Sequence, residues 1–156
     1  MGQLYNCELT MEYRGRLYSL KKSTDDGKLI GYAILKMDSP INIFNLNHEN
    51  NMIRYELIDK ILELQGNCSH EHIDDVLYIS ILEVMDEYKN HGYGRELFEV
   101  IKGNFPDKLI VIKAVPSSIK FWSKMGFKNI IDGIQYEESG FAAAYMYYKW
   151  KENNKC

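Results

Sequence analysis

Hydrophobic and polar residues follow two different spacings along this chain. The first third shows alternating or short-block patterns rich in Tyr, Leu and Thr, which favour β-strands, and we predict strands over residues 4–13, 16–21 and 28–37. The sequence TDDG at 24–27 predicts a tight turn, because Asp and Gly tolerate the positive φ of hairpin turns. Over 52–65 the apolar residues recur at helical spacing, which predicts one helix.

The second half of the chain alternates strands with helices. Residues 76–84 (VLYISILEV) are apolar almost throughout, which predicts a central strand covered on both faces. Further elements are expected as a helix from 94 to 103, a strand at 109–115, a short helix after Pro116, and strands at 127–131 and 141–150. Strands interleaved with helices indicate the α/β class.

Composition narrows the class of protein. The chain has 156 residues, which fits one domain, and its 46% hydrophobic and 26% charged residues exclude intrinsic disorder. The 19 basic and 22 acidic residues give a net charge of −3, which argues against a protein that binds the nucleic acid backbone. Membrane-length apolar runs and a signal-peptide layout are both missing from the sequence. We therefore expect a cytoplasmic protein with no membrane or nucleic acid partner.

The cysteines suggest neither disulfides nor a clear metal site. Cys7, Cys68 and Cys156 are odd in number and far apart, which is not a disulfide framework. Cys68, His70 and His72 stand at alternate positions, so an extended strand would place them on one face, where they could hold a metal ion. A second ligand pair is missing from the rest of the sequence, and we favour a solvated polar loop and no metal.

A glycine-containing turn is the most informative stretch. In residues 84–95 (VMDEYKNHGYGR) a buried strand leads into a turn with Gly92 and Gly94 and then into a helix. Glycines let backbone N–H groups converge, and the start of a helix carries partial positive charge, so the turn is a candidate phosphate site. It is not a Walker loop, because no Gly-Lys-Ser/Thr follows, and the third glycine of a dinucleotide fingerprint is missing. A tight turn without a ligand is the alternative.

Three segments together resemble the GNAT superfamily of N-acetyltransferases. In the family, Arg/Gln-x-x-Gly-x-Gly/Ala holds the pyrophosphate of acetyl-CoA, and residues 89–94 here read KNHGYG. Residues 121–127 (FWSKMGF) are similar to the family's Leu-Tyr-Glu-Lys-Leu-Gly-Phe, and residues 27–33 (GKLIGYA) look like its second hairpin. The resemblance covers 27–37 and 76–150, and its joint spacing is more specific than any one segment.

This resemblance implies a fold and an activity. The fold would be a mixed, mostly antiparallel central sheet of about seven strands with helices on both faces. One domain would span 1–156, with a variable N-terminal part at 1–75, a CoA-binding core at 76–127 and C-terminal strands at 127–150. The activity would be transfer of an acetyl group from acetyl-CoA to an amine of a small molecule or peptide, and such proteins often form homodimers.

The resemblance also implies which residues meet the co-substrate. Backbone N–H groups of the turn would hold the pyrophosphate, and main-chain N–H groups in the preceding strand would polarise the thioester carbonyl. Two further residues on the short helix are expected to line the CoA channel. The full set is Leu82, Val84, Lys89, Asn90, His91, Gly92, Tyr93, Gly94, Arg95, Ser118 and Trp122.

The catalytic acid and base do not follow from the family pattern. The positions where relatives often carry a basic Glu match Tyr78 and Ile110 here. Glu83 is the acidic residue of that strand, but its side chain should point to the opposite face of the sheet from that of Tyr78. A bulge between them would place both on one face. A base at Glu83, a water relay through Tyr78, and a purely solvated Glu83 all stay open. Trp122 stands where the family has its acidic Tyr, so Ser118 is the nearest hydroxyl candidate, with a helix cap as its alternative role.

Other departures leave the acceptor undefined. Lys89 replaces the family's Arg or Gln, the helix pair usual before the second strand is missing, and residues 40–75 insert a helix instead. Acidic residues in the middle of the chain favour a cationic acceptor or simply form a solvated surface; they are Glu56, Asp59, Glu63, Glu71, Asp74, Asp75, Glu83, Asp86 and Glu87. A CoA-binding module without transfer activity, and a structural domain whose turn holds nothing, are the rival functions.

Overall fold

The protein divides into two compact units. A computed structural model describes residues 6–12, 16–44, 51–66, 73–136 and 140–150. Unit 1 comprises Met1–Met37 and Ile79–Pro106, and unit 2 comprises Asp38–Tyr78 and Asp107–Cys156. Each unit is described by itself.

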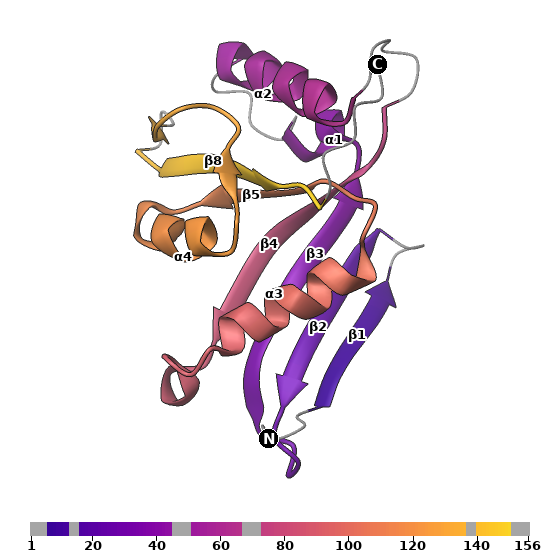
Figure 1. Cartoon of the computed structure of the whole chain (residues 1–156), viewed down its shortest axis with the longest axis vertical. Coiled ribbons are helices and arrows are strands. Elements are labelled where there is room, and N and C mark those ends of the chain that lie inside the picture. The colour runs from indigo at the N-terminus through magenta and orange to yellow at the C-terminus, as the bar shows by residue number, and fades with distance from the viewer. Residues whose placement is uncertain (1–5, 13–15, 45–50, 67–72, 137–139, 151–156) are drawn as a thin grey trace. The chain divides into compact units, whose positions relative to one another are not determined.

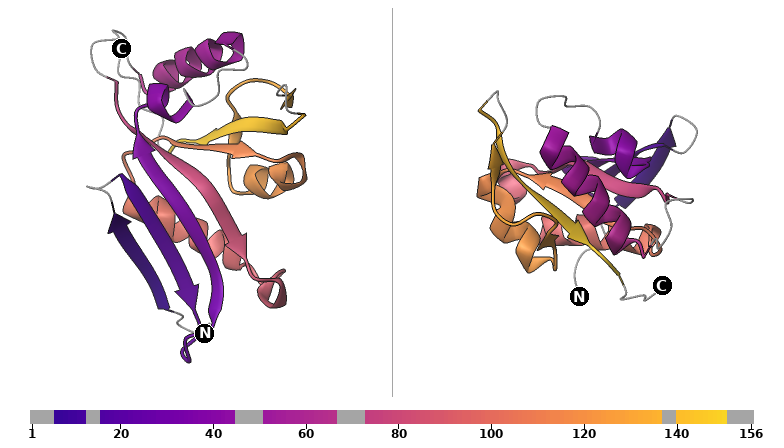
Figure 2. Two further views of the ribbon diagram at one scale, coloured as in Figure 1. Left: turned by 180° about the vertical axis from the view of Figure 1, so that it is seen from behind. Right: turned by 90° about the horizontal axis from the view of Figure 1, so that it is seen from above.

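Unit 1 is a sheet with one helix on one of its faces. Its elements are β1 (Asn6–Glu12), β2 (Leu17–Ser23), β3 (Leu29–Asp38), the second part of β4 (Val76–Val84), the short 3-10 turn η1 (Asp86–Tyr88) and α3 (Tyr93–Asn104). Figure 1 shows α3 lying across the strands, and the reverse view in Figure 2 shows the same strands in front of it. The helix packs there because its buried residues recur at helical spacing, at Leu97, Phe98 and Ile101.

The first three strands form two antiparallel hairpins. Leu9 pairs with Leu20, and Leu20 in turn pairs with Ala33, so one row of apolar side chains crosses β1, β2 and β3. The predicted turn between β2 and β3 is present: Gly27 has φ of 88° and its N–H donates to the carbonyl of Thr24 at 2.9 Å. The sequence therefore predicted this part of the fold correctly.

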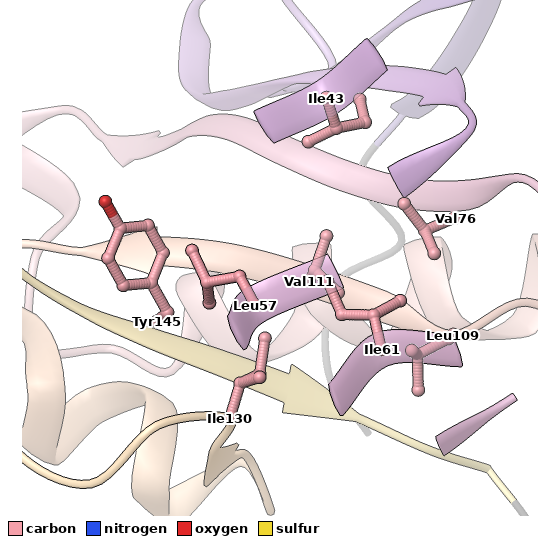
Figure 3. Close-up of a cluster of buried hydrophobic side chains, with 8 residues drawn as sticks. All are labelled: Ile43, Leu57, Ile61, Val76, Leu109, Val111, Ile130 and Tyr145. Carbon is pink, nitrogen blue, oxygen red and sulfur yellow. The ribbon is translucent and has the colours of Figure 1, made fainter. Parts of the chain in front are cut away.

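Unit 2 holds the remaining elements. They are α1 (Pro40–Phe44), α2 (Asn51–Leu64), the start of β4, β5 (Ile110–Ala114), η2 (Pro116–Ser118), α4 (Ile119–Lys124), β6 (Lys128–Asn129), β7 (Gln135–Tyr136) and β8 (Ala142–Tyr148). β4 pairs in parallel with β5, and β8 pairs antiparallel with β5, β6 and β7. Figure 3 shows its core, where α1 and α2 pack on the strands through Ile43, Leu57, Ile61, Val76, Leu109, Val111, Ile130 and Tyr145.

The strands occur in the hydrogen-bonded order β1-β2-β3-β4-β5-β8-β6, with β7 beside β8. This is the predicted mixed and mostly antiparallel sheet. Two expectations need correction. The helix α1 was not predicted, although Ser39 and Pro40 are start signals: the Ser39 Oγ accepts the N–H of Asn42 at 3.2 Å. The strand 76–84 is not covered throughout, because Ile81 and Glu83 in its second half are exposed.

Candidate functional site

The candidate site begins where β4 ends. The N–H of Met85 donates to the carbonyl of Ile30 at 2.8 Å, which ties the end of β4 to β3. η1 follows at once, and the chain then reverses through residues 89–92 into α3. The strand, the turn and the helix lie in unit 1, so their arrangement is fixed within one compact unit.

Two residues of the turn have left-handed backbone conformations. Asn90 has φ of 66°, and Gly92 has φ of 82° and ψ of 8° at the N-cap of α3. Asn and Gly tolerate this conformation best. Gly92 offers no side chain to cap the helix, and the first intrahelical bond runs from the N–H of Glu96 to the Gly92 carbonyl at 3.1 Å. The N–H groups of the first helical turn point out of the helix at this end, and together with the helix dipole they make the turn electropositive.

The side chains around the turn are paired with one another. Lys89 Nζ lies 3.0 Å from Asp86 Oδ1, and Lys28 Nζ lies 2.9 Å from Glu87 Oε2. The hydrogen bond from Lys28 to Glu87, and then the negative charge of Glu87, raise the pKa of the Lys28 ammonium. His91 is exposed, and its Nδ1–H donates to the carbonyl of Lys89 at 2.7 Å.

Lys22 fixes the start of α3, and sequence reasoning missed it. It is 5% exposed, and its Nζ lies 2.9 Å from Glu96 Oε2 and 5.8 Å from the ring centre of Tyr93. The signal was its position: in β2 it stands two residues after the buried Leu20, and alternate strand residues share a face. A buried cation and a carboxylate in the first turn of α3 hold the helix against β2.

Glu83 has a specific partner that the sequence did not reveal. The hydroxyl of Tyr32 in β3 donates to Glu83 Oε2 at 2.8 Å. This hydrogen bond is the main cause that raises the pKa of Tyr32, followed by partial burial and the charge of Glu83. The two side chains come from neighbouring strands and therefore mark one face of the sheet in unit 1.

The edge of β4 near Leu82 and Val84 is defined by one hydrogen bond, in which the N–H of Met85 faces β3. Successive N–H groups of a regular strand alternate between its two edges. Regular alternation predicts that the N–H groups of Val84 and Leu82 face the edge away from β3. Both side chains are half-buried.

Tyr78 and Ser118 lie in unit 2 with other contacts. The ring of Tyr78 meets that of Phe44 edge-to-face, with 6.3 Å between centres. Ser118 stands at the N-cap position of α4 but makes no side-chain cap. Its Oγ–H instead donates to the carbonyl of Val115 at 2.9 Å, so the predicted capping role is wrong, because the hydroxyl bonds backward into η2 rather than forward into α4.

Trp122 is part of the core of unit 2. It is 7% exposed, and its ring packs edge-to-face on Phe121 and Phe127, with 5.0 Å between centres in each pair. Phe127 in turn lies 5.7 Å from the ring centre of Tyr148.

Comparison with solved structures addresses the fold directly. The structure is similar to Arabidopsis thaliana NAA60 in complex with acetyl-CoA, with a TM-score of 0.60 and 16% identity over 85% of this chain and 76% of that one. It is also similar to arylalkylamine N-acetyltransferase 2 from Aedes aegypti (TM-score 0.56, 15% identity, 85% and 73% of the two chains). A third is the Bacillus subtilis N-acetyltransferase YlbP in complex with coenzyme A (TM-score 0.51, 22% identity, 84% and 66%).

The chain has the GNAT fold. No protein-family model matches the sequence, and no curated protein matches it either. The resemblance carried by residues 89–94 and 121–127 is therefore confirmed at the level of the fold. The expected departure of this chain from the family is also present, since the helices α1 and α2 stand between β3 and β4.

The structure also bears on the candidate metal cluster, on membrane-spanning helices and on the acidic residues. Cys68, His70 and His72 lie outside the described residues, and in the part of the chain that the structure describes no three ligand side chains gather to hold a metal ion. None of the described helices is long and apolar enough to cross a membrane. The acidic residues belong to separate units: Glu56, Asp59 and Glu63 on α2 in unit 2, and Glu83, Asp86 and Glu87 in unit 1.

Proposed function

We propose that the protein is an N-acetyltransferase that moves the acetyl group of acetyl-CoA to an amine. The observation that carries the proposal is the turn at residues 89–94, which connects the end of β4 to the start of α3. In this turn Asn90 and Gly92 have left-handed backbone conformations, and Gly92 is the N-cap of α3. The GNAT fold supports it, and so do the neighbours NAA60, in complex with acetyl-CoA, and YlbP, in complex with coenzyme A.

The turn would bind the pyrophosphate. The main-chain N–H groups from residue 90 to 95 supply donors, and the dipole of α3 favours negative charge at this end. Lys89 adds a point charge, which meets a phosphate without the planar fork of an arginine. Since Lys89 is paired with Asp86 at 3.0 Å, the phosphate would compete with that carboxylate.

The edge of β4 would polarise the thioester. The N–H groups of Leu82 and Val84 share the edge away from β3, so they offer two donors to a developing oxyanion. Their position directly before the turn would place an acyl group beside β4 when the pyrophosphate lies at residues 89–94. This use of the backbone is compatible with the half-burial of both side chains.

The net reaction of the thioester with an ammonium ion gives an amide and a thiol and releases one proton, which a base must accept. The nitrogen of the neutral amine attacks the carbonyl carbon, a C–N bond forms, the C–S bond breaks, and the thiolate takes up the proton that the nitrogen releases. An alkyl ammonium has a pKa of roughly 10.4, so a base must first neutralise it. We assign this to Glu83, with a water relay through Tyr78 as the alternative. A thiolate leaves readily because a thiol has a pKa of about 8.5, and the roles of Ser118 and Trp122 stay predictions.

The test combines binding with turnover. Isothermal titration with CoA measures the first step, and release of CoA thiol with a panel of amines measures the second. Binding with turnover supports the proposal. The rival CoA-binding module is favoured by the tryptophan at the family's acid position, and it predicts binding without thiol release. Absence of CoA binding by the folded protein would overturn both.

A further inference from the structure

Lys22 is a buried charged residue beside the glycine turn. Of the residues that the structure describes, it is the only charged one that is buried, with 5% of its surface exposed. Its Nζ lies 2.9 Å from Oε2 of Glu96, which stands in the first turn of α3. Burying an ammonium group is costly unless a charged or polar partner meets it. The ion pair therefore ties a buried cation in β2 to the start of the helix that follows the turn.

The geometry of the helix places Glu96 next to the turn. Its N–H donates to the carbonyl of Gly92 at 3.1 Å, so the two residues stand one helical turn apart. The Cα–Cβ bonds of a helix tilt toward its N-terminus, and the side chain of Glu96 therefore extends over the first turn of α3. This side chain is 53% exposed. A half-exposed carboxylate thus stands at the end of α3 where the N–H groups point out of the helix.

The carboxylate has opposite effects on an empty and an occupied turn. Negative charge at the N-terminus of a helix interacts favourably with the helix dipole, so Glu96 stabilises α3 when no anion is bound. A pyrophosphate bound at the turn is also negative, and it would meet Glu96 as a like charge. Lys22 removes this conflict, because an ammonium group 2.9 Å from the carboxylate makes the pair neutral.

Lys22 and Lys89 differ in what they can contact. The side chain of Lys89 is 56% exposed, whereas that of Lys22 is 6% exposed. Lys22 Nζ lies 5.8 Å from the ring centre of Tyr93 and 3.8 Å from Cys7 Sγ, which belong to the elements on either side of it. A phosphate can reach Lys89 directly, but Lys22 can act on it only through the charge of its pair with Glu96.

We propose that Lys22 is a positioning residue that sets the affinity for CoA by neutralising Glu96 at the start of α3. The pair is neutral in the native protein, negative when Lys22 is removed and positive when Glu96 is removed. This role rests on the first step of the proposed function, the binding of the CoA pyrophosphate at the turn, and it adds the residue pair that regulates that step.

Titration of CoA into four proteins separates the two charges. Lys22→Met keeps an unbranched side chain in place and leaves Glu96 unopposed, so CoA should bind about tenfold more weakly, as expected for a charge at a helix terminus. Glu96→Gln leaves the ammonium group unopposed, so CoA should bind about threefold more tightly. The double variant is neutral again and should bind CoA within about twofold of the native protein.

Two control variants leave the charge at the turn unchanged. Near the other end of α3, Lys102 Nζ lies 2.9 Å from Glu99 Oε2 and 5.9 Å from the ring centre of Phe98. This lysine stands about 14 Å along the helix from its start, beyond the screening length of roughly 10 Å at 0.1 M salt, so Lys102→Met should bind CoA like the native protein. Cys7→Ser removes the thiol beside Lys22 without changing a charge, and it should also bind CoA like the native protein.

Two further measurements respond to charge and not to a change in structure. Pantetheine carries no phosphate, so it should bind the native protein and all variants alike. The loss of CoA affinity in Lys22→Met should shrink as the salt concentration rises, because the carboxylate of Glu96 is half-exposed and its charge is screened.

The outcomes distinguish this role from the proposed function. If Lys22 only holds α3 on the sheet, each variant of the pair binds CoA and pantetheine more weakly and the double variant is not restored. That result would overturn the role while the native protein still binds CoA. If Lys22→Met does not fold, Glu96→Gln decides alone, since tighter CoA binding supports the role and weaker binding contradicts it. A native protein that does not bind CoA would overturn the proposed function and this role together.

Discussion

Glycines at positive φ bound both α3 and α4, and these two glycines differ in what lies beside them. Gly92, with φ of 82°, precedes α3, and a Cβ there would meet nothing within 4 Å. Gly126, with φ of 103°, follows α4, and a Cβ there would lie 3.3 Å from Cε2 of Tyr148. The N–H of Gly126 donates to the carbonyl of Ser123 at 3.0 Å, which closes the helix onto the core.

The comparison separates a turn with open space beside its glycine from a turn whose glycine is packed against a ring. Both glycines belong to the segments that resemble the GNAT pattern, and both meet the same conformational demand. What differs is the space beside them: at Gly92 the backbone borders solvent at the start of a helix, where N–H groups point outward. At Gly126 the backbone borders the ring of Tyr148 at the end of a helix, where carbonyl groups need partners.

The largest expected effect comes from removing the packing around the second turn. Trp122→Ala should lower the free energy of unfolding by about 3–5 kcal/mol, because Trp122 is 7% exposed between Phe121 and Phe127. Urea unfolding measures it, with Trp150→Ala, at a 41% exposed position, as the control. A loss below about 1 kcal/mol would show that Trp122 is not a core residue.

The next change tests the two glycines against each other. Gly126→Val should cost more stability than Gly92→Val, because left-handed strain of about 1–3 kcal/mol applies to both, while only Gly126 also meets a ring. Gly92→Val should instead weaken CoA binding at least about tenfold, or about 1.4 kcal/mol. Thermal unfolding and CoA titration of both folded variants are the measurements. Equal effects on both quantities would remove the distinction.

A smaller effect concerns the charge beside the first turn. Lys89→Ala should weaken CoA binding by about 1–3 kcal/mol, as for a charge-assisted hydrogen bond. Asp86→Asn should strengthen binding by about 0.2–1 kcal/mol, because it releases Lys89 from an exposed ion pair.

The double variant distinguishes these causes. With Lys89→Ala already present, Asp86→Asn should lose most of its benefit, and pantetheine, which lacks the nucleotide half, should bind all forms alike. Weaker binding of pantetheine to Lys89→Ala would indicate damage to the fold instead.

The smallest effect is a pH dependence at the sheet. The folded pKa of Tyr32 is raised by its hydrogen bond to Glu83, so its stabilisation is complete below the unfolded pKa of about 10 and is lost as the pH rises through the folded pKa. Native protein should therefore lose stability relative to Tyr32→Phe between pH 9 and pH 11. Parallel urea unfolding curves at each pH measure the difference, and a constant difference would contradict the bond.

Sequence patterns predicted the elements that depend on local signals. The strand 76–84 and the helix that α3 forms follow from apolar spacing, and the turn after 84 follows from its glycines. The partners across strands were not predictable, because Lys22 meets Glu96 and Tyr32 meets Glu83 only after the sheet has formed. Hydrophobic spacing shows which face of a strand is buried, whereas the contacts between side chains of neighbouring strands depend on the register of the strands.

The same reasoning explains the short elements that were missed. α1 spans Pro40–Phe44 and β7 spans Gln135–Tyr136, which is too few residues for a periodic pattern to show. Ser39 and Pro40 follow the third predicted strand, where the same pair can end a strand or start a helix.

The most direct test of the account is CoA binding at the turn before α3. Isothermal titration is carried out with the native protein and with Gly92→Val, each shown to be folded by circular dichroism. We expect one CoA bound per native chain and an affinity at least about tenfold weaker in the variant. No binding to the native protein, or equal affinity in the two proteins, would contradict the claim that this turn holds the pyrophosphate.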